Sequence, residues 1–172
     1  MQTRILITGA SGSGTTTLGR ALATRLGCTF HDGDDYYWLP TDPPFQRKQD
    51  PAIRVSRLLE ALQSAPTAVL AGSILNWSVE LEESLSLIVF LTVPAQTRVA
   101  RLREREIRRF GRVDPAFLAW AAQYDEGPPE GRSLSKHQAW LAKRSCTVLH
   151  IDGDTSTESR LERVLSVLNT TF

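Results

Sequence analysis

A glycine-rich loop between an apolar strand and a helix constrains the fold of this chain more than any other feature. Residues 4–8 form a short apolar run, and a helical pattern with one apolar face runs from Thr16 to Leu26. Residues 9–16 between them read GASGSGTT, with glycines spaced as in the phosphate-binding pattern G-x-x-x-x-G-K-[ST]. Backbone N–H groups of such a loop point inward and the helix N-terminus adds positive potential, so we expect it to bind phosphate.

The loop departs from that pattern at one position. Thr15 stands where the pattern has lysine, and none of the three lysines of the chain is nearby in sequence. Thr16 occupies the position of the magnesium-binding hydroxyl. A glycine turn without ligand and a dinucleotide-binding loop are the alternatives, and the second would need glycine in place of Ser13. The residues predicted to bind the phosphates of a nucleotide are Gly9, Ser11, Gly12, Ser13, Gly14, Thr15, Thr16 and Thr17.

Strand and helix patterns alternate five times along the chain. This alternation predicts an α/β protein with a five-stranded parallel sheet and helices on both faces, in three layers. Residues 33–49 are predicted to be a long loop, and ligands should bind beyond the carboxyl ends of the strands. Asp50-Pro51 and Asp114-Pro115 are predicted helix starts, and the spacing of Thr155 and Glu158 suggests another. The predicted strands are 4–8, 28–31, 68–71, 85–93 and 147–151.

Length and composition exclude several classes of protein. The 172 residues with net charge +1 predict a single domain over residues 1–172, and the near-neutral charge gives no case for a nucleic-acid partner. No apolar run approaches the roughly 18 residues that cross a bilayer, so no membrane partner is expected. Cys28 and Cys146 are too few for a disulfide framework and are predicted core residues. A reducing, cytoplasmic location is the default.

Charged side chains follow the second predicted strand and are frequent between residues 98 and 112. Asp32 and Asp34 come directly after the second predicted strand. Of the 20 basic residues, 17 are arginines, and seven of these fall between Arg98 and Arg112. Arginine suits bidentate contacts to phosphate or carboxylate. A solvated helix face paired with Glu104 and Glu106 is the structural alternative.

Several segments, in this order, resemble the small P-loop kinases: adenylate, shikimate and gluconate kinases. The loop 9–16 resembles their phosphate loop, and Phe30-His31-Asp32-Gly33-Asp34 is similar to a D-x-D motif after their second strand. Residues 88–94, followed by 101–105, resemble a strand and the entry to an arginine-bearing lid. Residues 149–154 are similar to the final strand and loop that cup adenine. The resemblance covers almost the whole chain and implies a P-loop NTPase fold with a lid at about residues 101–132.

The resemblance also implies roles for individual residues in phosphoryl transfer with ATP and Mg2+, which depends on positioning and charge stabilisation. Thr16 and Asp32 would hold the magnesium that the nucleotide brings, and Gly153 would lie in the adenine loop. Arg105 would contact the nucleotide as well as the transferring phosphate. The implied catalytic residues are Asp32, Asp34, Arg101, Arg105 and Arg109. The implied acceptor-binding residues are Asp34, Tyr37, Trp38, Arg54 and Asn76.

The first functional hypothesis is therefore an ATP-dependent kinase acting on a small molecule. The aromatic segment 36–45 favours a nucleoside or nucleotide acceptor over a sugar acid. A lid arginine is expected to replace the missing lysine. The alternatives are a nucleotide-binding or sensing protein without turnover, which Thr15 favours, and slow nucleotide hydrolysis without an acceptor.

Overall fold

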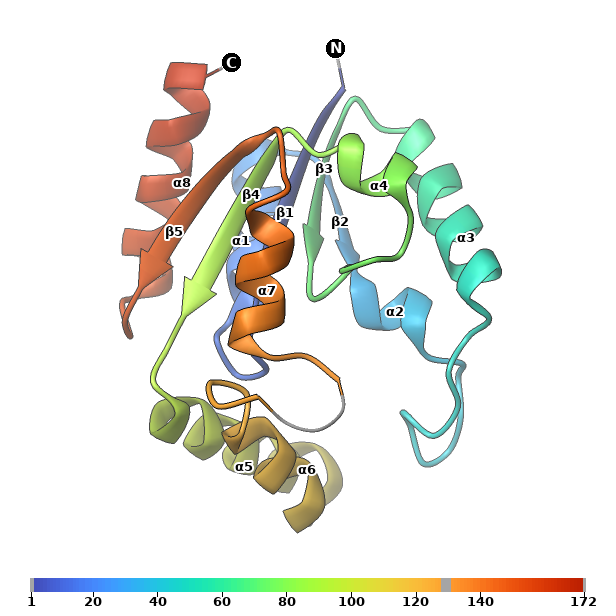
Figure 1. The fold of residues 1–172 in the computed structure, drawn as a ribbon, viewed down its shortest axis with the longest axis vertical. Coiled ribbons are helices and arrows are strands. Elements are labelled where there is room, and N and C mark those ends of the chain that lie inside the picture. The colour runs from blue at the N-terminus through green and yellow to red at the C-terminus, as the bar shows by residue number, and fades with distance from the viewer. Residues whose placement is uncertain (1, 128–130, 172) are drawn as a thin grey trace.

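Five parallel strands form one sheet in the order β2-β3-β1-β4-β5 (Figure 1), which confirms the predicted α/β class. The computed structural model describes residues 2–127 and 131–171. Each connection between consecutive strands contains at least one helix, as parallel strands require. The strands are β1 (Thr3–Gly9), β2 (Thr29–Asp32), β3 (Thr67–Ala71), β4 (Leu87–Thr92) and β5 (Thr147–Asp152).

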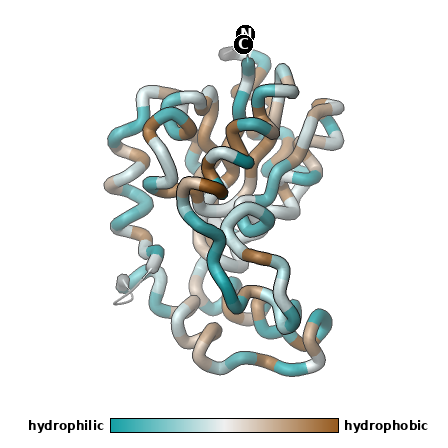
Figure 2. Tube along the Cα trace, turned by 90° about the vertical axis from the view of Figure 1, so that its right-hand side faces the viewer, coloured by the Kyte–Doolittle hydropathy of each residue, from teal (hydrophilic) through white to brown (hydrophobic). Residues whose placement is uncertain are grey.

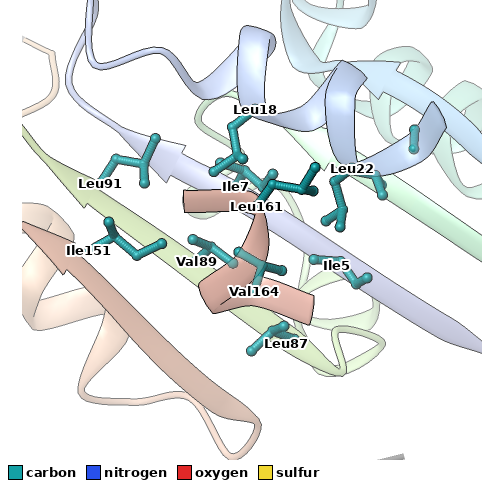
Figure 3. Packing of buried hydrophobic residues seen from close by; sticks show 12 residues of the cluster. Ile5, Ile7, Leu18, Leu22, Leu87, Val89, Leu91, Ile151, Leu161 and Val164 are labelled. Carbon is teal, nitrogen blue, oxygen red and sulfur yellow. The ribbon is translucent and has the colours of Figure 1, made fainter. Parts of the chain in front are cut away.

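Helices cover both faces of the sheet. Two of them pack on one face, where Leu18 and Val164 meet the side chains of the central strands (Figure 3). Three others cover the opposite face through residues such as Leu58, Leu81 and Trp140. The first pair is α1 (Thr15–Leu26) and α8 (Thr157–Thr171), and the second group is α3 (Pro51–Gln63), α4 (Val79–Glu83) and α7 (Leu134–Leu141).

The central strands are apolar throughout because both of their faces are covered. Ile5 and Ile7 of β1 face α1 and α8, whereas Leu6 between them belongs to the core on the other face. All three side chains are fully buried. The register of β1 against β3 and β4 places Gly9 at the carboxyl edge of the sheet, so the loop that follows opens there.

The carboxyl edge is overlaid by two further helices, α5 (Ala95–Phe110) and α6 (Pro115–Ala122) (Figure 1). The start of β1 and the end of α8 lie at the opposite end of the molecule. Figure 2 shows hydrophobic segments gathered in the half that holds the sheet, and hydrophobic and hydrophilic segments mixed in the other half. Arg98 fixes α5 to its surroundings: the buried guanidinium donates to the carbonyls of Val93 and Ala121 and pairs with Asp125.

The structure corrects two predicted elements and adds one helix that was not predicted. Residues 33–49 are not all loop, because α2 (Gly33–Tyr37) begins with Asp32, whose carboxylate accepts from the N–H of Asp34. The short helix α4 was not predicted, and α8 begins one residue later than the Thr155 spacing suggested. The actual cap is Ser156, whose hydroxyl accepts from the N–H of Ser159. Among the described residues, no helix is long and apolar enough to span a membrane.

Candidate active site

The glycine-rich loop joins β1 to α1 and leaves the start of α1 without a capping side chain in the described part of the chain. Its first-turn N–H groups therefore have no partner within the helix and are available to an anion. Gly12 and Gly14 have φ angles of 84° and 92°, which glycine adopts readily. A Cβ on Gly12 would lie 2.7 Å from the carbonyl oxygen of Arg98, so the loop lies directly against α5.

Ser13 and Arg160 give the loop its rigidity. The N–H of Ser13 donates to the carbonyl of Ala10 at 3.1 Å. The carbonyl of Ser13 accepts from Nη1 of Arg160 at 2.8 Å, and Nη2 of the same guanidinium donates to the carbonyl of Gly153. The backbone groups of Ser13 are thus already engaged, and its buried hydroxyl has no partner among the described residues. Ser13 shapes the loop, and the first-turn N–H groups of α1 that follow it have no partner within the helix.

Thr16 and Asp32 meet at the mouth of the loop. The hydroxyl of Thr16 donates to Oδ2 of Asp32 at 2.9 Å. Thr16 lies in the first turn of α1, and Asp32 is the last residue of β2, two strands away in the sheet. A hydroxyl and a carboxylate oxygen are the donors that Mg2+ prefers beside phosphate and water. This pair therefore fits a magnesium ion brought by a nucleotide.

Asp34 lies next to this pair, where its N–H donates to Asp32, and its side chain is exposed to solvent. Partial desolvation and the negative charge of Asp32 raise the pKa of Asp34, although the positive charges of Arg132 and Arg105 act in the opposite direction. A carboxylate with a raised pKa accepts a proton more readily near neutral pH than an ordinary one. The position and the pKa shift both suit a general base.

The three predicted arginines of α5 share one side of the helix because they are four residues apart. Arg101 pairs with Asp154, beside the loop after β5. The charge of Arg105 acts on Asp34, and Arg109 stacks on Phe45 at 5.1 Å in the aromatic segment. The helix ends at Phe110 with Gly111 in the left-handed conformation, so Arg112 lies outside it. The three side chains therefore span the edge of the site and do not gather over the phosphate loop.

The predicted adenine side is open. Gly153 follows β5 with φ 85°, and its N–H donates to the carbonyl of Thr92 at 2.8 Å. A Cβ at Gly153 would have no atom within 4 Å. The face of this loop can therefore be approached by a flat ring. Thr17, in the first turn of α1, is exposed to solvent.

The predicted acceptor residues lie around α2 and α3. The guanidinium carbon of Arg54 lies 4.8 Å from the ring centre of Tyr37 and 4.7 Å from that of Trp77. Trp38 contacts Tyr37 edge-on, and its backbone forms a bridge with Lys48. The buried Nε of Arg54 has no hydrogen-bond partner among the described residues. The guanidinium of Arg54 therefore lies against the rings of Tyr37 and Trp77.

The described hydrogen bond of Asn76 does not involve this cluster. It adopts φ 58°, its side chain is exposed, and its N–H donates to Glu82 at 2.7 Å. Glu82 also pairs with Arg144 at the end of α7. The structure therefore gives the backbone of Asn76 a role in the turn after β3.

A buried polar chain below the loop was missed by sequence reasoning. The ring of His137 faces the hydroxyl of Thr8 at 3.4 Å through Nε2 and the hydroxyl of Tyr124 at 2.7 Å through Nδ1. Burial and the charge of Arg132 lower the pKa of His137 to about 4, so the ring is neutral at pH 7. Thr8 directly precedes the glycine loop. A separation of 129 residues between Thr8 and His137 leaves no local signal for this contact.

Arg132 contacts both the phosphate loop and an aromatic ring of α6. Its Nη2 donates to the hydroxyl of Ser11 in the loop at 3.3 Å, and its guanidinium lies over the ring of Trp120 at 5.7 Å. The ammonium group of Lys136 donates to the carbonyl of Gly131 and not to the loop. Residues 128–130 of the predicted lid lie outside the described residues.

The chain is similar to known proteins over nearly its whole length. The sequence model of a family described as an AAA domain matches residues 5–113. The uncharacterized protein YqaC of Bacillus subtilis (strain 168) is 38% identical over 179 residues, covering 98% of this chain and 99% of that protein.

Solved structures of kinases share the fold. A shikimate kinase from Bacteroides thetaiotaomicron superposes with a TM-score of 0.61 at 21% identity, covering 97% of this chain and 98% of the other. A gluconokinase from Sinorhizobium meliloti 1021 gives a TM-score of 0.56 at 20% identity, with 98% and 96% covered. The match of the AAA domain model to residues 5–113 shows that the chain belongs to this family, and its fold is that of the solved kinases.

Proposed function

We propose that the protein transfers the γ-phosphoryl group of ATP to a hydroxyl of a small molecule, with Mg2+ as the metal. The observation that carries the proposal is the hydrogen bond of Thr16 to Asp32 at the mouth of an uncapped glycine loop. Asp34 lies beside this pair within the field of Arg105 and Arg132. Oxygen donors, free N–H groups and cations thus meet where a triphosphate would enter.

The residues divide the chemistry among them. The acceptor oxygen forms a bond to the γ-phosphorus while the bond from that phosphorus to the β–γ bridging oxygen breaks, and ADP leaves. Asp34 takes the proton of the acceptor hydroxyl, for which its raised pKa suits it. The N–H groups of the loop and the arginines stabilise the charge on the transferring group. Thr16 and Asp32 would hold magnesium, which would supply positive charge to offset that of the phosphates.

We further propose a hydroxy acid as the acceptor, where the sequence alone favoured a nucleoside. Tyr37 and Trp77 already have the guanidinium of Arg54 as a ring partner, so they are less free to stack on a base. Arg54 itself lacks a carboxylate partner among the described residues, and its buried Nε is unpaired. A carboxylate of the acceptor would satisfy it. Kinases of shikimate and of gluconate with the same fold support this choice.

Calorimetric titration with Mg-ATP, followed by a phosphoryl-transfer assay, tests the proposal. Sugar acids and shikimate form one acceptor group and nucleosides the other. We expect binding of Mg-ATP and transfer to a member of the first group. Binding without transfer to any acceptor would favour the nucleotide-sensing alternative, which Thr15 supports. Phosphate release independent of acceptor would indicate simple hydrolysis.

Arg54→Met separates the acceptor site from the nucleotide site. The change should raise KM for an acidic acceptor about tenfold or more, because a charge-assisted hydrogen bond contributes roughly 1.5–3 kcal/mol. The KM for ATP should stay unchanged. Arg57→Met, one turn along α3 and exposed, is the matched control. Equal effects of the two changes would contradict the assignment of Arg54.

A further inference from the structure

The loop without a lysine raises the question of which cation acts on the phosphates. A lysine at position 15 would place its charge against the transferring group, and threonine cannot. Among the described residues, no lysine contacts the loop: Lys48 lies over Tyr37, and Lys136 donates to Gly131. The replacement must therefore be an arginine.

Two arginines contact or adjoin the loop, but all three guanidinium nitrogens of each are already bonded within the protein. Arg160 uses all three guanidinium nitrogens, on Thr155, Ser13 and Gly153, and is buried. Arg98 is likewise buried and bonded through its three nitrogens to α6 and its surroundings. Both brace the loop and α5, and neither can turn toward a phosphate without breaking those bonds.

The α5 arginines predicted to replace the lysine also lie elsewhere. Arg101 is paired with Asp154, and Arg109 is stacked on Phe45 and Phe110. Arg105 lies within the field of Asp34, but no described contact joins it to the loop.

Arg132 differs from all of these. It is half-buried at the start of α7, contacts the loop through Ser11, and has its guanidinium supported by the ring of Trp120. Arg132 therefore contacts the phosphate loop directly, and its single described hydrogen bond is a long one to a neutral hydroxyl. An anionic phosphate is a stronger acceptor than that hydroxyl.

We propose that Arg132 binds the transferring phosphate in place of the missing loop lysine. This inference rests on the proposed function. It predicts that positions 15 and 132 are functionally exchangeable: a lysine at position 15 should make Arg132 dispensable. Such compensation arises only if both side chains act on the same group.

Four proteins test the proposal: the wild type, Arg132→Met, Thr15→Lys and the double variant. Methionine keeps an extended apolar side chain against Trp120 but removes the charge. We expect Arg132→Met to lower kcat for phosphoryl transfer, or for ATP hydrolysis where no acceptor is added, by about 10²–10³-fold. Thr15→Lys should recover at least tenfold in the Arg132→Met background and change the wild type much less.

Controls keep the two proposals distinguishable. Arg25→Met removes the same charge from an exposed position in the last turn of α1 and should leave kcat unchanged. Arg132→Lys keeps the charge and should lose less than Arg132→Met, and far-UV circular dichroism verifies that each variant is folded. A wild type that does not bind Mg-ATP in calorimetry would overturn the proposed function itself. A wild type that binds and turns over ATP, with Arg132→Met equal to Arg25→Met or with Thr15→Lys acting equally in both backgrounds, would overturn the role of Arg132 alone.

Discussion

At the scale of residues, the glycine loop is defined by close contacts as much as by backbone freedom. Gly12 has both a positive φ and a neighbouring carbonyl, that of Arg98, where a side chain would begin. Gly27, at the end of α1, has φ 63° but nothing within 4 Å of a Cβ. The two positions share the backbone requirement and differ in the steric one.

Gly12→Ala should therefore cost more stability than Gly27→Ala. A left-handed alanine costs roughly 1–2 kcal/mol, and the clash with Arg98 should add about 1–3 kcal/mol more. Urea unfolding at equilibrium measures both. Equal losses at the two positions would mean that α5 can move away from the loop without cost. Gly12→Ala should also weaken ATP binding, whereas Gly27→Ala should not.

At the scale of elements, features set by residues close in sequence were predicted, whereas contacts between residues far apart in sequence were not. Asp50 and Asp114 cap their helices as expected, because a carboxylate reaches the N–H groups two and three residues on. Thr16 and Asp32 were expected at one magnesium site, but the direct hydrogen bond between them was not predicted. The contacts of Arg132 with Ser11 and of His137 with Thr8 span more than 120 residues and have no periodicity or spacing to reveal them.

His137 of α7 is a titratable side chain buried in the core. The ordinary pKa of 6.5 falls to about 4 in the folded state, because burial and Arg132 disfavour the charged ring. Between these values the unfolded chain binds a proton that the folded chain does not. Stability therefore falls as pH decreases from about 6.5 toward 4, by up to about 1.4 kcal/mol per pH unit for this group.

His137→Gln should flatten this dependence. Glutamine cannot titrate, so the difference in unfolding free energy between wild type and variant should shrink as pH falls from 7 to 4. Urea denaturation at several pH values measures the two slopes. Parallel slopes for wild type and His137→Gln would show that His137 is not the buried neutral group described above.

At the scale of the whole molecule, the candidate site draws on segments from most of the chain. The phosphate loop follows β1, Asp32 ends β2, α5 lies across the edge, and Arg132 precedes α7 (Figure 1). Residues this far apart in sequence are close together only when the sheet is formed. A ligand that bridges them binds the folded state and not the unfolded chain, so its binding energy adds to the stability of the entire fold.

Mg-ATP at one hundred times its Kd should therefore stabilise the protein by about 2.7 kcal/mol, which for a chain of this size corresponds to roughly 5–10 °C in Tm. Thermal unfolding followed by circular dichroism measures the shift. ATP with a chelator should give a smaller shift, because the Thr16–Asp32 pair then lacks the metal that joins it to the phosphates. Asp32→Asn should reduce the difference between the two conditions, whereas Asp35→Asn, exposed on α2, should preserve it. Equal shifts with and without magnesium in the wild type would contradict the assignment of this pair, even if ATP itself binds.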